Sequence, residues 1–300
     1  MQCLSKPISR RTFNKRLRDS SISLFSASFI GSERLMETVV TLMLKSQYPK
    51  TYGVLEKAGQ DNRRINKLLS DSRLELYPEI KGFFENPAED LPYAEYRITL
   101  GVPKKILDAK EFMKEHITDL TRVETDSGVD RSIIVAILAV ESHLGKNKGK
   151  RNPMGAFITM IEQIPAKEGF GKRQLLELLK FCEKHGFDPY SFKGSYAGAM
   201  EWAHFIPESL NWGFVDGDGD GKPNPKSLMD SMKSIAHYLQ NHDKSGNAWV
   251  LGGAIEENSK NWRALLSYNP RENYVKAVKE IAEVIDIPLI LRQAMKTGLI

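Results

Sequence analysis

Residues 216–221 read Asp-Gly-Asp-Gly-Asp-Gly, and this run constrains the local fold more than any other segment of the 300-residue chain. The carboxylates of Asp216, Asp218 and Asp220 alternate, so they can point into one hollow and offer the oxygen ligands that hard cations prefer. Gly221 stands sixth, where an EF-hand loop needs a residue that can turn sharply. The spacing therefore predicts the start of a calcium loop.

The end of this loop departs from the EF-hand pattern. Position twelve, which normally carries a bidentate Glu, is Ser227, and the next carboxylate is Asp230 at position fifteen. We expect residues 216–230 to hold one structural Ca²⁺, with the carbonyl of Lys222 and the carboxylate of Asp230 among its ligands. The alternative is a solvated Asp/Gly hairpin that binds no metal.

A second constraint is the apolar run 132–141, which follows Asp130 and precedes Gly145. Asp130 is a favourable N-cap and Gly145 a favourable residue just past a helix end, so the run predicts a compact buried helix. Glu141 lies on its apolar face. A carboxylate held against apolar neighbours is easier to protonate, and a protonated Glu can act as a general acid. Alternatively, Glu141 turns to water or pairs with a lysine of residues 146–148.

Further motifs occur in a fixed order along the chain. Residues 193–200 read Lys-Gly-Ser-Tyr-Ala-Gly-Ala-Met, and residues 205–207 read Phe-Ile-Pro before the aspartate loop. This order resembles the lytic murein transglycosylase B family, in which Gly-Ser-aromatic-Ala-Gly-Ala-Met and Gln-Phe-apolar-Pro-Ser segments precede a calcium loop. Glu141 stands where that family has its catalytic Glu. The resemblance continues through residues 267–274 and covers about residues 50–285.

The resemblance implies a mainly α fold with a lysozyme-like, goose-type catalytic core over residues 96–286. It also implies a lytic transglycosylase that cleaves the MurNAc–GlcNAc β-1,4 bond of peptidoglycan without water. In this chemistry the C6 hydroxyl of MurNAc attacks its own anomeric carbon and leaves a 1,6-anhydro end. A single Glu serves first as acid and then as base, and the resemblance assigns both roles to Glu141.

Six other residues, among them His204, are implied to contact the glycan strand or to orient the acid. Ser195 and Tyr196 are expected to open a helix, with the Ser195 hydroxyl near Glu141. Asn269 can hydrogen-bond the acid or the substrate acetamido group. The rings of Tyr268 and Tyr274 can form the floor of a sugar subsite, although aromatic residues at such positions also occur as core.

Two positions depart from the family pattern. His204 replaces the usual Gln; it can still exchange hydrogen bonds with a sugar, and it can also titrate. Leu144 replaces an aromatic residue. These changes leave altered subsite preference or an inactive, glycan-binding descendant as alternatives. A lysozyme-type hydrolase is a further alternative, for which Glu201 is the candidate second carboxylate.

The net charge of +5 belongs to the first residues of the chain. Of 43 Lys and Arg and 38 Asp and Glu, six basic residues and one acidic residue lie before position 20, so the rest carries 37 of each. A neutral body argues against nucleic-acid binding. Residues 9–15 resemble a twin-arginine export motif, so we expect residues 1–32 to be an export leader and the enzyme to be periplasmic. Because Asp19 and the missing Ala-x-Ala site count against this, a basic tail is the alternative.

Apolar residues recur at helical spacing along most of the chain. The periodic segments are 33–44, 52–69, 79–84, 102–123, 173–185, 228–239 and 273–284. A break near Pro87 and Pro92 sets off a helical N-terminal subdomain over residues 33–95, and residues 287–300 remain an unassigned tail. We expect no transmembrane segment, a monomer, peptidoglycan as the partner, and Cys182 as a small apolar residue without a disulfide.

Overall fold

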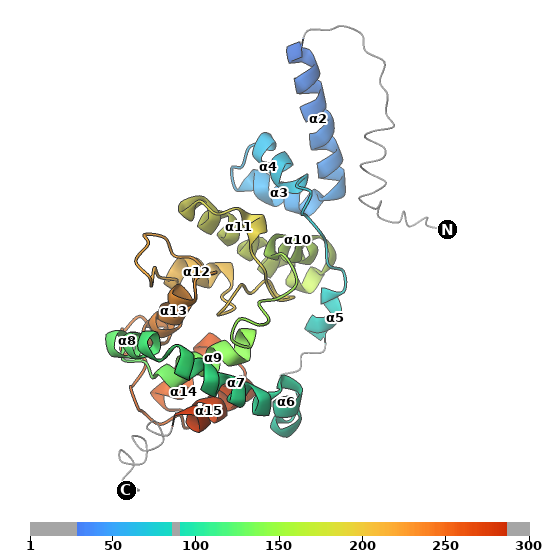
Figure 1. Ribbon diagram of the computed structural model, residues 1–300. Helices are drawn as coiled ribbons and strands as arrows, with labels where there is room; N and C mark the ends of the chain where they lie inside the picture. Colours follow the sequence, from blue (N-terminus) through green and yellow to red (C-terminus); the bar gives the residue numbers. More distant parts are fainter. Residues whose placement is uncertain (1–28, 86–90, 287–300) are drawn as a thin grey trace, which may run out of the picture.

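The computed structural model describes residues 29–85 and 91–286, which are mostly α-helical (Figure 1). The N-terminal helices are α2 (Phe29–Gln47), α3 (Pro49–Lys57), α4 (Asn62–Leu69) and α5 (Ile80–Glu85). They are followed by α6 (Tyr93–Leu100), α7 (Val102–Glu115), α8 (Ile117–Ser127), α9 (Arg131–Ser142), α10 (Pro153–Gln163), α11 (Glu168–His185), α12 (Pro207–Gly213), α13 (Leu228–Asn241), α14 (Lys260–Tyr268) and α15 (Glu272–Ile285). The prediction of a mainly α fold is confirmed. Most of the predicted leader and all of the predicted tail lie outside the described residues.

Two of the predicted periodic segments are each divided into two helices. Segment 52–69 is interrupted after α3, where Gly59 has a left-handed φ of 78° and Asp61 caps α4 by accepting from the backbone N–H of Arg64. Segment 102–123 is interrupted at His116, between α7 and α8. The spacing of apolar residues alone predicted one helix in each segment, whereas local capping ends one helix and starts another.

Helix α9 lies within the lower group of helices in Figure 1 and packs against α7 and α15. Its residues from Ser132 to Val140 are all buried. The Asp130 side chain makes no N-cap bond to this helix; its carboxylate instead accepts from the indole N–H of Trp249 and the backbone N–H of Gly252, each at 3.0 Å. The predicted capping role of Asp130 is therefore wrong, since a buried carboxylate satisfies more donors across the loop that follows α13.

Helices α10 and α11 form a second packed pair, and α11 also packs against α12. Helix α10 does not appear among the predicted segments, because nearly all of its side chains are apolar and buried and its sequence has no amphipathic period. Its start does carry a signal, since Asn152 accepts from the N–H of Met154 and Pro153 occupies the first turn.

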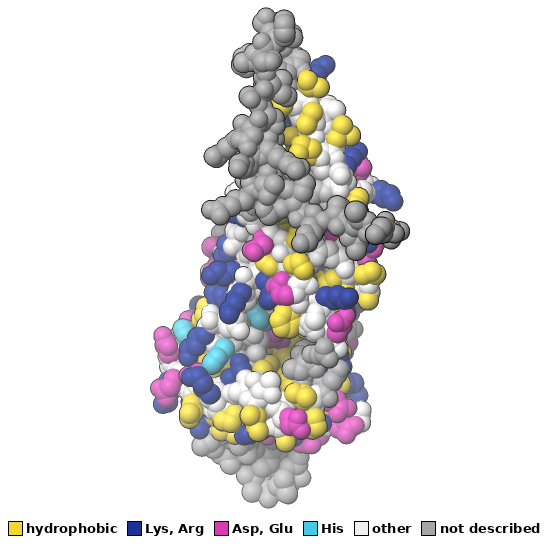
Figure 2. All heavy atoms as spheres, turned by 90° about the vertical axis from the view of Figure 1, so that its right-hand side faces the viewer, with side chains coloured by type: hydrophobic (Ala, Val, Ile, Leu, Met, Phe, Trp, Pro, Cys, Tyr) yellow, Lys and Arg dark blue, Asp and Glu magenta, His cyan; other side chains and the backbone are white. Residues whose placement is uncertain are grey.

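Helices α2–α4 form one end of the molecule, and α14 and α15 lie near the other (Figure 1). Helix α2 exposes large apolar side chains at Leu35, Met36, Val39 and Leu42, the first of them 65% exposed. Hydrophobic side chains are visible at this end of the face shown in Figure 2.

Cys182 is buried on α11, and burial raises the pKa of its thiol to about 12. It belongs to the buried hydrophobic core, which confirms the prediction that it packs as a small apolar side chain. No helix in residues 29–85 or 91–286 combines the length and apolar character needed to cross a membrane.

Candidate functional site

The candidate acid, Glu141, lies in the last turn of α9. Apart from this residue and Arg131, every residue of α9 is buried, and the Glu141 side chain keeps 15% of its surface exposed. After Ser142 the chain leaves the helix through three left-handed residues, His143, Leu144 and Gly145, with φ of 51°, 57° and 78°. The helix thus ends before Gly145, and this tight exit leaves the carboxylate in the last turn, beside the loops that carry the other candidate residues.

His204 is one of the ionisable side chains that approach Glu141. Its Nδ1 lies 3.4 Å from Oε2 of Glu141, and its own side chain is only 12% exposed. The other ring nitrogen, Nε2, is buried and has no hydrogen-bond partner among the described residues. A buried, unpartnered nitrogen is costly unless a ligand or water satisfies it. His204 can therefore contact the acid through Nδ1 while Nε2 stays available to a bound ligand.

Tyr274, at the start of α15, is a second neighbour of the acid. Its hydroxyl is buried and has no hydrogen-bond partner of ordinary length within the described part of the chain. Burial, and next the negative charge of Glu141, raise the pKa of Tyr274 well above its usual value. A tyrosine that stays protonated beside a carboxylate can donate a hydrogen bond to it or to a bound ligand.

Tyr268 connects the acid to the loop that carries His204. Its hydroxyl donates to the carbonyl of Ala203 at 2.6 Å, and its ring lies parallel to that of Tyr274, with centroids 6.3 Å apart. Burial followed by the charge of Glu141 raises the pKa of Tyr268 well above its usual value. Tyr268 therefore holds the backbone next to His204, a contact that the sequence did not predict.

Asn269 follows directly and ends α14, where its backbone N–H donates to the carbonyl of Leu265 at 3.0 Å. The structure gives its side chain no contact with Glu141. Its predicted hydrogen bond to the acid or the acetamido group stays a prediction.

Ser195 does not open a helix, so that expectation is wrong. Residues 193–200 form a tight turn in which the Ser195 hydroxyl accepts from the N–H groups of Ala197 and Ala199, each at 3.2 Å. Gly198 has a φ of 80°, and a Cβ there would lie 2.2 Å from the ring of Phe157. The turn is therefore built by a left-handed glycine and a side-chain cap in place of a helix. Its proposed contact with Glu141 is not among those the structure shows.

Tyr196, at the tip of this turn, packs against α5. Its ring lies 5.3 Å from Phe83 and 5.1 Å from Phe84, measured between centroids. Phe83 is 46% exposed, and the guanidinium of Arg151 lies 5.3 Å from its ring. Tyr196 thus joins the N-terminal helices to the motif 193–200, and an exposed aromatic surface adjoins it.

Lys105 is a charged neighbour of the acid that the sequence analysis missed. It is only 7% exposed, and its ammonium donates to the carbonyl of Ala139 at 2.5 Å, two residues before Glu141. Burial lowers its pKa to about 8, while the charges of Glu141 and Asp108 oppose that shift. A signal was present, because Lys105 falls on the apolar face of α7, three residues after Val102 and four before Ala109.

Glu201 and the basic loop 146–151 hold the local structure together. Glu201 is 4% exposed and accepts from the backbone N–H of Lys193 at 2.9 Å, with the ammonium of Lys148 at 3.9 Å. Lys148 also lies over the ring of Trp202 at 4.2 Å. Arg151 pairs with Glu79 at 2.9 Å. Glu201 is thus tied to the protein backbone, which does not favour the role of a second catalytic carboxylate.

The aspartate loop brings three carboxylates together. Ligand oxygens of Asp216, Asp218 and Asp230 all lie within 4.8 Å of one another, and Asp230 is fully buried. Asp230 also accepts from the backbone N–H groups of Gly217, Asp218 and Asn224, so it organises the loop as well. Such a group of oxygen donors fits a hard cation, since the carboxylates would otherwise repel one another.

Two predicted ligands, Asp220 and the carbonyl of Lys222, are not part of this group of three carboxylates. Asp220 lies outside the group of three and accepts from the N–H of Lys222 at 2.8 Å. Ser227, at the position of the usual bidentate Glu, donates from its hydroxyl to Asp218 at 2.9 Å and caps α13. The participation of Asp220 and of the Lys222 carbonyl stays a prediction.

Comparison with known proteins relates the chain to a family of transglycosylases. Residues 51–260 match the family described as Transglycosylase SLT domain. Membrane-bound lytic murein transglycosylase B of Escherichia coli is 29% identical over 212 residues, which are 67% of this chain and 57% of that protein. The chain therefore spans little more than half the length of that relative.

Solved structures show the same fold. Lytic transglycosylase SltB1 of Pseudomonas aeruginosa superimposes with a TM-score of 0.69 at 25% identity, covering 79% of this chain and 95% of that one. Escherichia coli lytic transglycosylase Slt35, solved in complex with calcium, gives a TM-score of 0.68 at 20% identity and covers 84% and 94%. The predicted lytic transglycosylase fold is confirmed.

Proposed function

Because the chain belongs to the SLT transglycosylase-domain family, we propose that it is a peptidoglycan lytic transglycosylase acting on the MurNAc–GlcNAc β-1,4 bond. Glu141 protonates the glycosidic oxygen as the bond to the anomeric carbon breaks, so GlcNAc leaves with a new O4 hydroxyl. Glu141 then takes the proton of the C6 hydroxyl as that oxygen bonds to the anomeric carbon. The proton count balances without water, and the product end is 1,6-anhydroMurNAc.

The position of Glu141 carries this proposal. Its carboxylate is mostly buried in the last turn of a fully packed helix, yet keeps an exposed edge through which a sugar can reach it. Tyr274 and His204 approach it from different elements. A rigid helix and two flanking polar side chains provide the fixed geometry that proton transfer to a bound glycan requires.

His204 has a double role in this proposal. Nδ1 lies beside the acid and can fix the orientation of its carboxylate, while the buried Nε2 offers a hydrogen bond to the substrate. Substrate binding would then satisfy a nitrogen that has no protein partner. Ser195, Tyr196, Tyr268 and Asn269 are proposed to shape the neighbouring subsites.

Hydrolysis by a lysozyme-type mechanism needs a second carboxylate at the sugar. Glu201 was the candidate, and its bond to the Lys193 backbone and its burial instead support a structural role. This favours the intramolecular attack over attack by water.

We propose that Asp216, Asp218 and Asp230 hold one Ca²⁺, with Asp220 and the carbonyl of Lys222 as further candidate ligands. When bound, the cation supplies charge compensation for the clustered carboxylates. The residues themselves fix the loop that connects α12 to α13, after the segment that bears His204. Because the proposed substrate, peptidoglycan, lies outside the cytoplasm, we also propose an envelope location for the enzyme and an export role for residues 1–32.

The test is mass spectrometry of the soluble products from purified peptidoglycan incubated with the protein. Products ending in 1,6-anhydroMurNAc are expected. Reducing MurNAc ends would show a hydrolase, and the absence of soluble products together with sedimentation on the polymer would show a glycan-binding protein. Peptidoglycan incubated without protein gives the background of anhydro ends.

A further inference from the structure

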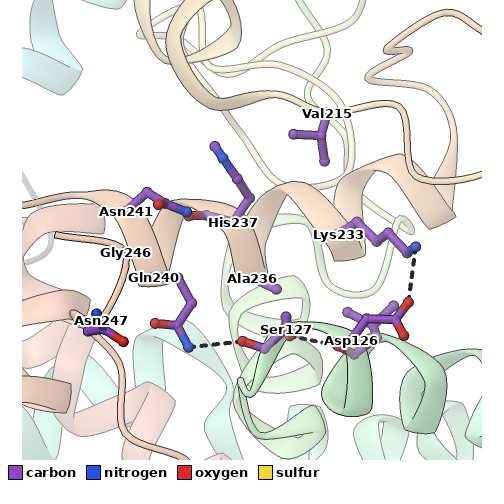
Figure 3. Close-up of a pocket in the computed structure, with 11 residues that line it drawn as sticks. Asp126, Ser127, Val215, Lys233, Ala236, His237, Gln240, Asn241, Gly246 and Asn247 are labelled. Carbon is purple, nitrogen blue, oxygen red and sulfur yellow. Dashed lines mark hydrogen bonds and ion pairs between the residues drawn. The ribbon is translucent and has the colours of Figure 1, made fainter. Parts of the chain in front are cut away.

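A hollow of about 500 Å³ lies between α8 and α13, apart from Glu141 and its neighbours (Figure 3). Polar side chains of α13 form much of its wall, and Val215 and the backbone at Gly246 border it. None of the residues that line it was singled out by the sequence analysis or takes part in the proposed reaction.

Trp212 does not line the hollow itself but lies beside His237, which does. The indole is 43% exposed, and its ring lies 6.3 Å from the His237 ring, between centroids. Its inner edge packs against Tyr238 at 5.2 Å with the planes at 81°. The indole is therefore held by packing against Tyr238, while part of its ring remains open to solvent.

The polar side chains near Trp212 are held in fixed orientations. Nδ1 of His237 lies 3.0 Å from the carbonyl of Gly213, so this nitrogen carries the proton and Nε2 is an acceptor when the ring is neutral. The His237 side chain extends from α13 toward Val215 in Figure 3. The amide of Asn241 donates to the carbonyl of His237 at 2.8 Å, which leaves its Oδ1 as a second oriented acceptor.

The charges of the hollow compensate each other. Lys233 and Asp126 form an ion pair of 3.3 Å on its wall, seen as a dashed line in Figure 3. Because this pair neutralises the lysine, the hollow carries no excess charge that would select an anion or a cation. Its chemistry suits a neutral ligand with hydroxyl or amide donors and one apolar face.

We infer that Trp212 and this hollow form a second glycan-binding site, which takes N-acetylhexosamine units of a β-1,4-linked strand. The apolar face of a pyranose ring packs on the exposed indole, and its hydroxyl or acetamido N–H groups donate to His237 and Asn241. Flat aromatic surface combined with a few oriented polar groups gives both affinity and orientation.

Ring contacts connect this site to the candidate active site. Trp212 contacts Tyr238, and the ring of Tyr238 lies 5.1 Å from that of Tyr268, whose pKa responds to the charge of Glu141. The two sites are thus linked by a continuous series of packed rings. The inference rests on the proposed function in that the same polymer is the substrate.

The test is isothermal titration of the full chain carrying Glu141→Gln with a GlcNAc hexasaccharide as the probe, so that binding is measured without turnover. Trp212→Ala in this background should weaken hexasaccharide binding about tenfold, equivalent to the loss of one good contact. Ile98→Ala, which truncates an exposed apolar side chain on α6, is the matched control and should bind like the parent.

Trp212→Leu keeps an apolar cover over Tyr238 but removes the flat ring, so it should lose affinity as well, with an unchanged melting temperature. Equal affinity of the parent and both Trp212 variants, or no binding by the parent, would overturn the inference. Its failure is distinguishable from that of the proposed function: anhydro products with Trp212-independent binding refute only this site. Trp212-dependent binding without anhydro products refutes only the activity.

Discussion

Nδ1 of His204 lies 3.4 Å from Oε2 of Glu141, and the opposite nitrogen of the same ring is buried without a partner. One imidazole thus faces the candidate acid on one side and an unsatisfied position on the other. Such an arrangement places one ring where it can hydrogen-bond both the acid and a bound ligand.

We expect His204→Gln to retain activity within about tenfold, because an amide can still hydrogen-bond both the acid and a sugar. Initial rates of anhydro-product release test this expectation. His204→Leu is the contrast and should lose more activity, because leucine makes no hydrogen bond to the acid or to a sugar. Equal rates in the two variants would contradict the proposed hydrogen bonds of His204.

Glu141→Gln should reduce turnover by at least about a hundredfold, because the amide keeps volume and hydrogen bonding but cannot transfer a proton. The melting temperature and sedimentation with peptidoglycan should be preserved. Glu201→Gln is the matched control: its amide oxygen can still accept from Lys193, so turnover should persist. If Glu141→Gln keeps a tenth of the activity while Glu201→Gln loses it, the acid has been misassigned.

Lys105 predicts a distinctive dependence of stability on pH. Burial lowers its pKa from the ordinary 10.5 to about 8. Between these values the unfolded chain binds more protons than the folded one, so the free energy of unfolding should rise with pH through this window. The contribution is on the order of 3 kcal/mol.

Lys105→Met should remove that rise, as measured by urea denaturation at pH 7.5 and pH 10. Lys104→Met is the control. The Lys104 side chain is 72% exposed, so its replacement should leave the rise intact. Equal pH dependence in the Lys105 variant and the wild type would mean that the ammonium is better hydrated than its burial indicates.

Calcium should raise the melting temperature, by the equivalent of about 3 kcal/mol at a hundredfold excess over the dissociation constant. Asp218→Asn should abolish this response, since its carboxylate belongs to the group of three. Asp220→Asn should reduce the response less, because Asp220 lies outside that group. Differential scanning fluorimetry with calcium and with chelator compares them; a melting temperature that is indifferent to calcium in the wild type would refute the metal site.

Much of this architecture was predictable because its signals are local. The apolar run before Glu141, the amphipathic pattern of α15 and the alternating aspartates each specify their own segment. The prediction was wrong at Ser195. There the backbone conformation is determined by Gly198, which is left-handed and packs on Phe157, and residue propensities cannot predict such a tertiary contact. The prediction also missed Lys105, whose partner carbonyl belongs to another helix.

Helix α9 has almost no solvent-facing side, and this restricts where the sequence can accept insertions or deletions. One residue inserted before Glu141 would rotate the carboxylate by about 100° around the helix axis, away from His204 and Tyr274. The same insertion would shift every buried side chain that follows it out of its place in the core. Insertions and deletions that alter substrate choice are therefore expected outside α9, where they leave Glu141 in register with the core.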